Sequence, residues 1–240
     1  MSELVAPSSH ATTKRHHDVP IWLADAVTLA SLACAVVAMV STLQQNYMLA
    51  SGVIILAVFT DGLDGCVARL CGRTSRVGEQ LDSLSDVVVF GAAPALLVYA
   101  FFLEQVPIPG TIVAVVFVLA AAFRLANFHA EPNQSYFCGL PTTITGAFLA
   151  TLPFLGASFP SIIIALAMLV LGYLMLSTLR FPKVGLLMAP FPRQARWIVG
   201  CSVPVLYLTH PQWLLVLPVL YISVSLFWNV QIAARSEQRA

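Results

Sequence analysis

The chain has 240 residues, of which 59% are hydrophobic and only 10% are charged. Soluble domains usually hold about half apolar and about a quarter charged residues, so this composition indicates a membrane protein with several spans. The formal net charge of +1 gives no sign of a polyanion partner, and we expect no nucleic acid to bind. The five scattered cysteines form no CxxC pair, which argues against a zinc site and against a disulfide framework.

Residues 1–20 are polar and are expected to form a cytoplasmic tail. The apolar run after Lys14 and Arg15 continues through Val40. We therefore expect this run to be the first membrane span and not a cleaved signal peptide.

Eight apolar segments follow one another along the chain, and a bilayer core of about 30 Å takes roughly 20 helical residues. Because backbone groups in hydrocarbon must bond within their own segment, we expect each one to be a helix. The segments are 22–43, 47–68, 79–103, 111–130, 142–158, 160–179, 197–209 and 212–231. Turns are expected between them at 107–110, at Gly156 with Pro160, and at Pro211.

The positive charges predict the orientation of these spans. With eight alternating helices, all twelve Lys and Arg residues fall at one set of helix ends, which holds both termini. The opposite loops hold none. The positive-inside rule therefore places both termini and the 69–78 loop in the cytoplasm.

Four aspartates interrupt the second and third apolar segments. Asp61 and Asp64 are three residues apart, and Asp82 and Asp86 are four apart, so each pair projects from one face of its helix. Because the two helices run antiparallel, we expect both pairs to reach a similar depth within the cytoplasmic leaflet.

Charged groups at that depth need compensation, because an aspartate near mid-membrane costs about 2.5–3.5 kcal/mol and four would repel one another. Pairing with Arg69, Arg73 and Arg76 or exposure to water is one solution. Divalent cations are the other: carboxylate oxygens suit Mg²⁺ or Mn²⁺, and four carboxylates could hold two ions about 4 Å apart, as in phosphoryl chemistry.

Small residues and one arginine accompany the aspartates. Gly65 and Ala68 share a helix with the first pair, and Gly78 lies one turn before Asp82. They leave room either for a bulky ligand or for close helix packing. The planar guanidinium group of Arg69 could form two parallel hydrogen bonds to a phosphate group.

The whole pattern, Asp61-x2-Asp64-Gly65-x2-Ala68-Arg69-x8-Gly78-x3-Asp82-x3-Asp86, resembles the signature of the CDP-alcohol phosphotransferases in all eight fixed residues. The resemblance implies a membrane enzyme that moves a phosphatidyl group from a CDP-linked lipid to an alcohol and releases CMP. It also implies a homodimer. The UbiA-type prenyltransferases carry their two Asp motifs much farther apart.

Three further segments are similar to the bacterial phosphatidylserine synthase branch of that family: LDSLSDVVVFGAAPAL (81–96), FRLANF (123–128) and YFCGLPTT (136–143). This likeness implies CDP-diacylglycerol and L-serine as substrates. It also implies an all-α membrane bundle with a six-helix core at 21–185 and two more helices at 186–232. A cytoplasmic tail at 233–240 would follow.

A serine acceptor demands a cation for its carboxylate. Candidates at cytoplasmic helix ends are Arg124, Arg180 and Lys183, although each could equally be an ordinary positive-inside or snorkelling residue. The Gly139–Thr143 stretch has the Pro and Thr of a helix start, whose free N–H groups could cap the helix or meet an anion.

We therefore expect Asp61, Asp64, Asp82 and Asp86 to bind the metal ions, with Asp86 also acting as general base. Gly65, Ala68, Arg69 and Gly78 are expected to contact the nucleotide and diphosphate. The alternatives are a sibling enzyme that uses glycerol phosphate or an inositol phosphate, and a divalent-cation transporter, since intramembrane carboxylates also mark ion pathways.

Overall fold

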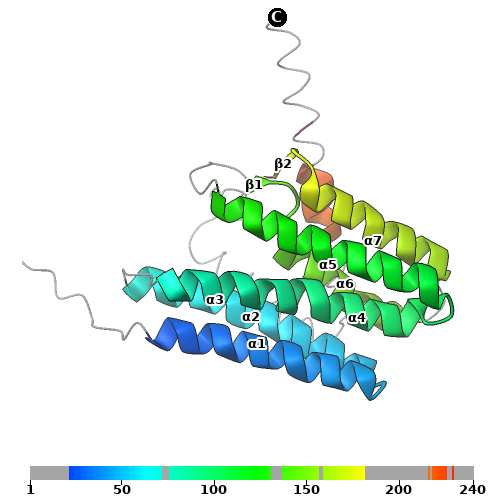
Figure 1. Cartoon of the computed structure of the whole chain (residues 1–240), viewed down its shortest axis with the longest axis horizontal. Helices are drawn as coiled ribbons and strands as arrows, with labels where there is room; N and C mark the ends of the chain where they lie inside the picture. The colour runs from blue at the N-terminus through cyan, green and yellow to red at the C-terminus, as the bar shows by residue number, and fades with distance from the viewer. Residues whose placement is uncertain are drawn as a thin grey trace, which may run out of the picture.

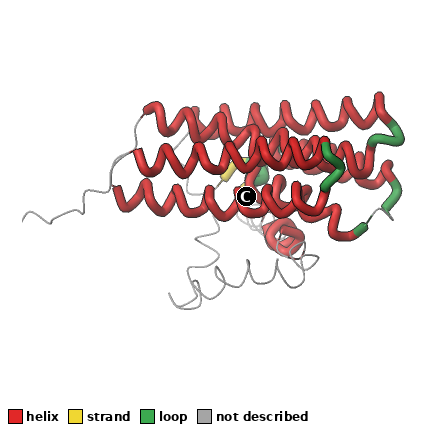
Figure 2. The backbone as a smooth tube through the Cα atoms, turned by 90° about the horizontal axis from the view of Figure 1, so that it is seen from below, coloured by secondary structure: helices red, strands yellow, loops and turns green. Residues whose placement is uncertain are grey.

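The computed structural model of the protein describes residues 22–71, 76–130, 137–156, 159–181, 216, 218–225 and 229. Within them lies a bundle of long helices that run along a common direction (Figure 1). Seen from below, the same helices lie side by side in layers (Figure 2). In the described part, the only other secondary structure is one pair of two-residue strands.

The first two helices form a hairpin: α1 is Trp22–Leu43 and α2 is Tyr47–Cys71. Both agree with the predicted spans. Small side chains are fully buried between neighbouring helices, which lets their backbones approach closely; they are Ala35, Ala38, Ala50 and Ala57. The connection turns through Gln45, whose φ is 60°.

The third predicted span is one continuous helical stretch from Arg76 to Leu103. It consists of α3 (Arg76–Asp86), the π-helical turn η1 (Val87–Ala92), α4 (Ala93–Val98) and a second π-helical turn, η2 (Tyr99–Leu103). A π turn widens the helix and shifts the side chains that follow onto a different face. Neither π turn was predicted from the sequence, which indicated an ordinary helix over this span.

Helix α5 is Pro107–Ala130, so the turn that we predicted at 107–110 is wrong. The two prolines and Gly110 lie inside the first turn of the helix, where a missing backbone N–H has no intrahelical partner to lose. The N–H of Gly110 already donates to the carbonyl of Val106 at 2.8 Å.

The next helices along the chain are α6 (Thr142–Thr151), which continues as a 3₁₀ turn η3 (Leu152–Leu155), and α7 (Ser161–Leu176). The strand β1 (Phe137–Cys138) pairs antiparallel with β2 (Arg180–Phe181), so the segment before α6 lies beside the segment after α7.

Three of these helical stretches are long and apolar enough to cross a membrane: Asp25–Leu43, Val77–Leu103 and Pro107–Asn127. Shorter apolar helices cover Tyr47–Asp61, Thr142–Leu155 and Ser161–Leu176. Large apolar side chains on the outer faces are exposed, including Leu119, Ile162 and Val170, which suits contact with lipid. The protein is an integral membrane helix bundle. The predicted seventh span lies outside the described residues, and of the eighth only 216, 218–225 and 229 are described, as helix.

Candidate active site

The candidate site lies toward the end of the bundle at which α1 and α3 begin and α2 and α5 end. The start of α1, the end of α2, the start of α3 and the end of α5 all lie at the left of Figure 1. Asp61 stands in the last part of α2, whereas Asp82 and Asp86 stand one turn apart at the end of α3. An antiparallel arrangement of α2 and α3 therefore brings aspartates from two helices to one level.

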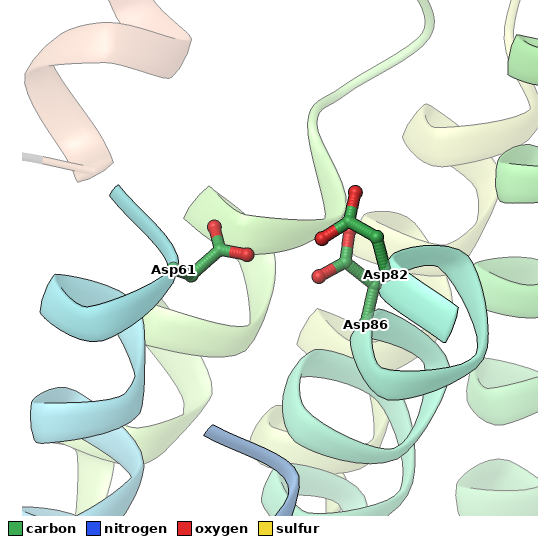
Figure 3. A group of neighbouring side chains, drawn as sticks. All are labelled: Asp61, Asp82 and Asp86. Atoms are coloured by element: carbon green, nitrogen blue, oxygen red, sulfur yellow. The ribbon is translucent and has the colours of Figure 1, made fainter. Parts of the chain in front are cut away.

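The carboxylates of Asp61, Asp82 and Asp86 converge. Each offers an oxygen atom that lies within 4.8 Å of the others, and all three side chains are partly buried. Figure 3 shows the group of Asp61 pointing from α2 toward the pair on α3. We predicted that aspartates from the two helices lie close together, and these three residues do. Of 62–71, which include Asp64, Gly65, Ala68 and Arg69, the structure describes only the helical backbone.

This arrangement fits a divalent cation. Two unit charges about 4.8 Å apart repel by roughly 3 kcal/mol at an effective dielectric constant of about 20, so three ionised carboxylates destabilise one another. Two oxygens on one octahedral Mg²⁺ lie about 3.0 Å apart when adjacent and about 4.2 Å apart when opposite. The three carboxylate oxygens, which lie within 4.8 Å of one another, are therefore close to the spacing that a shared cation requires.

Asp86 stands directly before the π turn η1, and close packing holds this turn from two sides. Gly91 in η1 faces Ala121 of α5, where an added Cβ would lie 3.3 Å from the alanine Cβ. Gly146 of α6 lies against Phe90, which is fully buried. Because η1 packs this closely against α5 and α6, it cannot shift along or away from them. The position and direction of the end of α3, which carries Asp86, are therefore fixed by this packing.

Among the described residues, Arg124 of α5 is a cation that interacts electrostatically with one member of this cluster, Asp86. Its side chain is only 9% exposed. One guanidinium nitrogen, Nη1, donates a hydrogen bond to the Thr142 hydroxyl at the start of α6. Of the three cations proposed from the sequence for the acceptor, Arg124 is the one whose side chain is described; it hydrogen-bonds to Thr142 and lies within electrostatic range of Asp86.

The segment before α6 is fixed to the end of α7. Gly139, with φ at 77°, donates its N–H to the carbonyl of Leu179 at 2.9 Å, and Leu140 donates to that of Leu174 at 3.0 Å. Pro141 ends this turn and α6 begins at Thr142, as the Pro and Thr predicted. The role of Thr142 as the partner of Arg124 was not predicted, because only the fold brings residues of α5 and α6 together.

The other predicted residues are placed less completely. Gly78 lies one turn before Asp82 in α3 and is partly buried. Arg180 pairs through its backbone with Cys138 in the strand pair; its side chain and the whole of Lys183 lie outside the described part of the chain.

Several known proteins with similar sequences share the same name. The chain is 31% identical over 172 residues to a CDP-diacylglycerol--serine O-phosphatidyltransferase of Bacillus subtilis, and the match covers 71% of this chain and 96% of that protein. Proteins of the same name match from Methanocaldococcus jannaschii, at 39% over 130 residues, and Helicobacter pylori, at 32% over 148 residues. The first match covers 54% of this chain and the second 58%, and each covers 62% of the relative.

The family comparison covers the same part of the chain as the site. Residues 21–188 match the CDP-alcohol phosphatidyltransferase family, a range that includes the aspartate cluster, Arg124 and Thr142. The match spans most of the chain, and it contains every helix from α1 to α7. The protein is therefore a member of the CDP-alcohol phosphatidyltransferase family.

Proposed function

We propose that this protein transfers the phosphatidyl group of CDP-diacylglycerol to L-serine and releases phosphatidylserine and CMP. The observation that carries the proposal is the convergence of Asp61, Asp82 and Asp86 within 4.8 Å, in a chain that matches this family over 21–188. The names of the relatives support serine as the acceptor. Membership of a transferase family favours this reaction over the transport of divalent cations.

The carboxylates would hold two divalent cations, Mg²⁺ or Mn²⁺, with Asp64 as the fourth ligand. When bound, such ions neutralise the diphosphate and stabilise the charge that develops on the leaving group. The Gly65–Gly78 region would lie against the nucleotide, with Arg69 on a phosphate oxygen.

Asp86 would act as general base. It would take the proton of the serine hydroxyl while the serine oxygen forms a bond to the β-phosphorus of CDP-diacylglycerol. The bond from that phosphorus to the bridging oxygen breaks, and CMP leaves with the electron pair. Arg124, beside Asp86 and buried, would bind the carboxylate of serine through charge-assisted hydrogen bonds.

The test of this proposal is an acceptor-dependent CMP release assay with the purified protein and CDP-diacylglycerol. We expect turnover with L-serine and none with glycerol 3-phosphate or an inositol phosphate. Turnover with a polyol phosphate alone would assign the chain to a sibling activity. Flux of Mg²⁺ or Mn²⁺ into liposomes that lack CDP-lipid would instead support the transporter.

For the whole chain we propose a cytoplasmic tail at 1–20, a catalytic core at 21–185, two further spans at 186–232 and a cytoplasmic tail at 233–240. Eight spans with both termini in the cytoplasm would place the carboxylates on the cytoplasmic side of a bacterial inner membrane, and the active unit would be a homodimer. Cysteines introduced at residues 5 and 238 should react with a membrane-impermeant maleimide only after the cells are opened.

A further inference from the structure

The π turn η1 and helix α5 touch at a pair of small residues, Gly91 and Ala121. Both are buried, and a Cβ added at 91 would lie 3.3 Å from the Cβ of Ala121. That is tighter than an ordinary contact between two methyl groups, whose carbon atoms prefer about 3.5–4.0 Å. The two backbones therefore stand as close together as one glycine and one alanine allow.

Asp86 and Arg124 lie about one helical turn from this contact, on the same side of it. Asp86 comes five residues before Gly91, which is the spacing of a π-type hydrogen bond, and Arg124 comes three residues after Ala121. Helix α3 begins and α5 ends at the same end of the bundle (Figure 1), so both steps lead toward that end. The contact thus sets the distance between the backbone positions that carry Asp86 and Arg124.

Helix α6 holds the other end of the arginine side chain. The Arg124 guanidinium group donates a hydrogen bond to the hydroxyl of Thr142. Thr142 lies one turn before Gly146, where an added Cβ would be 2.8 Å from the Cα of Phe90 in η1. Arg124 is therefore tied to η1 twice, through α5 at its backbone and through α6 at its guanidinium group.

In the proposed reaction the acceptor reaches two groups at once, because its hydroxyl meets Asp86 and its carboxylate meets Arg124. Serine carries these two groups on neighbouring carbon atoms, whereas L-homoserine has one more methylene group between them. A site with a fixed separation distinguishes the two, since one methylene group in a pocket changes kcat/KM by roughly 10- to 200-fold.

We propose that Gly91 and Ala121 determine the length of the acceptor. Their close contact sets the separation of Asp86 and Arg124, and this separation selects serine over an amino acid with a longer side chain. Both are positioning residues that act through Asp86 and Arg124. The assignment rests on the proposed function, which gives the acceptor hydroxyl to Asp86 and its carboxylate to Arg124.

The variant Gly91→Ala tests the proposal because its methyl group forces η1 and α5 apart by a few tenths of an ångström. We expect kcat/KM for serine to fall about three- to tenfold, as for a small misplacement of reacting groups. The ratio of kcat/KM for L-homoserine to that for serine should rise by a similar factor, and the KM for CDP-diacylglycerol should stay unchanged. Both acceptors are compared in the CMP release assay.

The double variant Gly91→Ala/Ala121→Gly is the rescue. It moves the methyl group from α5 to η1 and leaves one such group at the contact, so the acceptor ratio should return to the wild-type value. Gly172→Ala is the matched control: it adds a methyl group against the next residue of α5, Ala120, at an ordinary 3.6 Å, and its acceptor ratio should equal that of the wild type.

Two outcomes in folded protein would overturn the proposal: an unchanged acceptor ratio in Gly91→Ala, or a ratio that stays raised in the double variant. If Gly91→Ala does not fold, Ala121→Gly decides, because it removes a methyl group and adds none. The helices can then approach more closely, so kcat/KM for serine should fall without any gain for L-homoserine, and unchanged kinetics would overturn the proposal.

The wild-type protein separates this proposal from the proposed function. Release of CMP with serine, together with an unchanged acceptor ratio in the variants, would overturn the role of Gly91 and Ala121 alone. Release of CMP with a polyol phosphate and not with serine would overturn the proposed function, and the role of the two residues with it.

Discussion

Gly146 of α6 lies against the backbone of Phe90, in the π turn that follows Asp86. A Cβ added at 146 would lie 2.8 Å from both the Cα and the carbonyl oxygen of Phe90. Backbone atoms cannot move aside as a flexible side chain can, so α6 and η1 approach this closely only because residue 146 is glycine.

The substitution Gly146→Ala should therefore lower both stability and activity. We expect a loss of about 1–3 kcal/mol, typical of overpacking in a well-packed interior, with a lower thermal unfolding temperature in detergent. Gly172→Ala is the control, because a Cβ there would meet Ala120 at an ordinary 3.6 Å and alanine favours a helix. Equal unfolding temperatures for both variants would show that η1 is not held by this contact.

Replacing Asp82 with asparagine should abolish catalysis while the fold is kept. The side chain keeps its size but loses the charge that a divalent cation needs. We expect CMP release to fall by at least about a hundredfold, similar to the loss of an electrostatic catalytic group. Glu79→Gln, on the same helix but outside the cluster, should retain activity. An active Asp82→Asn variant would contradict the metal assignment.

Removal of divalent cations should affect stability as well as turnover. The clustered carboxylates repel one another without a cation, so Mg²⁺ or Mn²⁺ bound to the folded state should raise the unfolding temperature. At a concentration one hundred times the Kd, the gain is about 2.7 kcal/mol. EDTA should abolish CMP release, and added Mg²⁺ or Mn²⁺ should restore it. In Asp82→Asn the metal-dependent rise in unfolding temperature should be lost, which separates binding from activity.

The hydrogen bond from Arg124 to Thr142 predicts that two substitutions of Thr142 have different effects. Thr142→Val keeps the shape but removes the acceptor of a charge-assisted bond, and we expect the KM for serine to rise about tenfold. Thr142→Ser keeps the hydroxyl and should behave like the wild-type protein. Kinetics with varied serine at saturating CDP-diacylglycerol measure both. The same KM in Val and Ser variants would exclude a role for this bond.

Two glycines with nearly equal positive φ angles differ in the space around them, so their alanine variants distinguish backbone strain from steric crowding. Gly139 has φ of 77° and Gly156 has φ of 78°. A Cβ at 139 would lie 2.1 Å from the carbonyl oxygen of Met175, whereas a Cβ at 156 would meet no atom of the described residues within 4 Å. Gly156→Ala should cost about 1–3 kcal/mol for backbone strain alone, because φ of 78° with ψ of 172° is a conformation that almost only glycine adopts. Gly139→Ala should cost clearly more and should also raise the KM for serine, because it displaces the turn before Thr142. Thermal unfolding and kinetics of the two variants measure the difference.

The sequence predicted much of the architecture because membrane helices are determined locally. Apolar length marks a span, and backbone bonds close within each segment. The helices α1, α2, α6 and α7 begin within a few residues of the predicted spans. The error at 107–110 has the same local origin: proline and glycine mark a turn and a first helical turn equally well.

The aspartate cluster was also predictable from the sequence. Its residues follow helical spacing on two antiparallel helices and resemble a known signature; they are Asp61, Asp64, Asp82 and Asp86. Asp61, Asp82 and Asp86 do meet. The contact of Arg124 with Thr142 was not predictable, since the two residues lie on different helices and their pairing carries no signature of its own.

By itself, then, the sequence determined the apolar helices, their order and the acidic pairs, because spacing along one helix fixes which side chains share a face. The tertiary structure alone decided the π turn after Asp86 and the close contact of Gly146 with Phe90. It also decided which polar groups surround Arg124. The physical reason is that these features depend on the packing of helices against one another, and side-chain packing across a bundle has no period that a single segment could display.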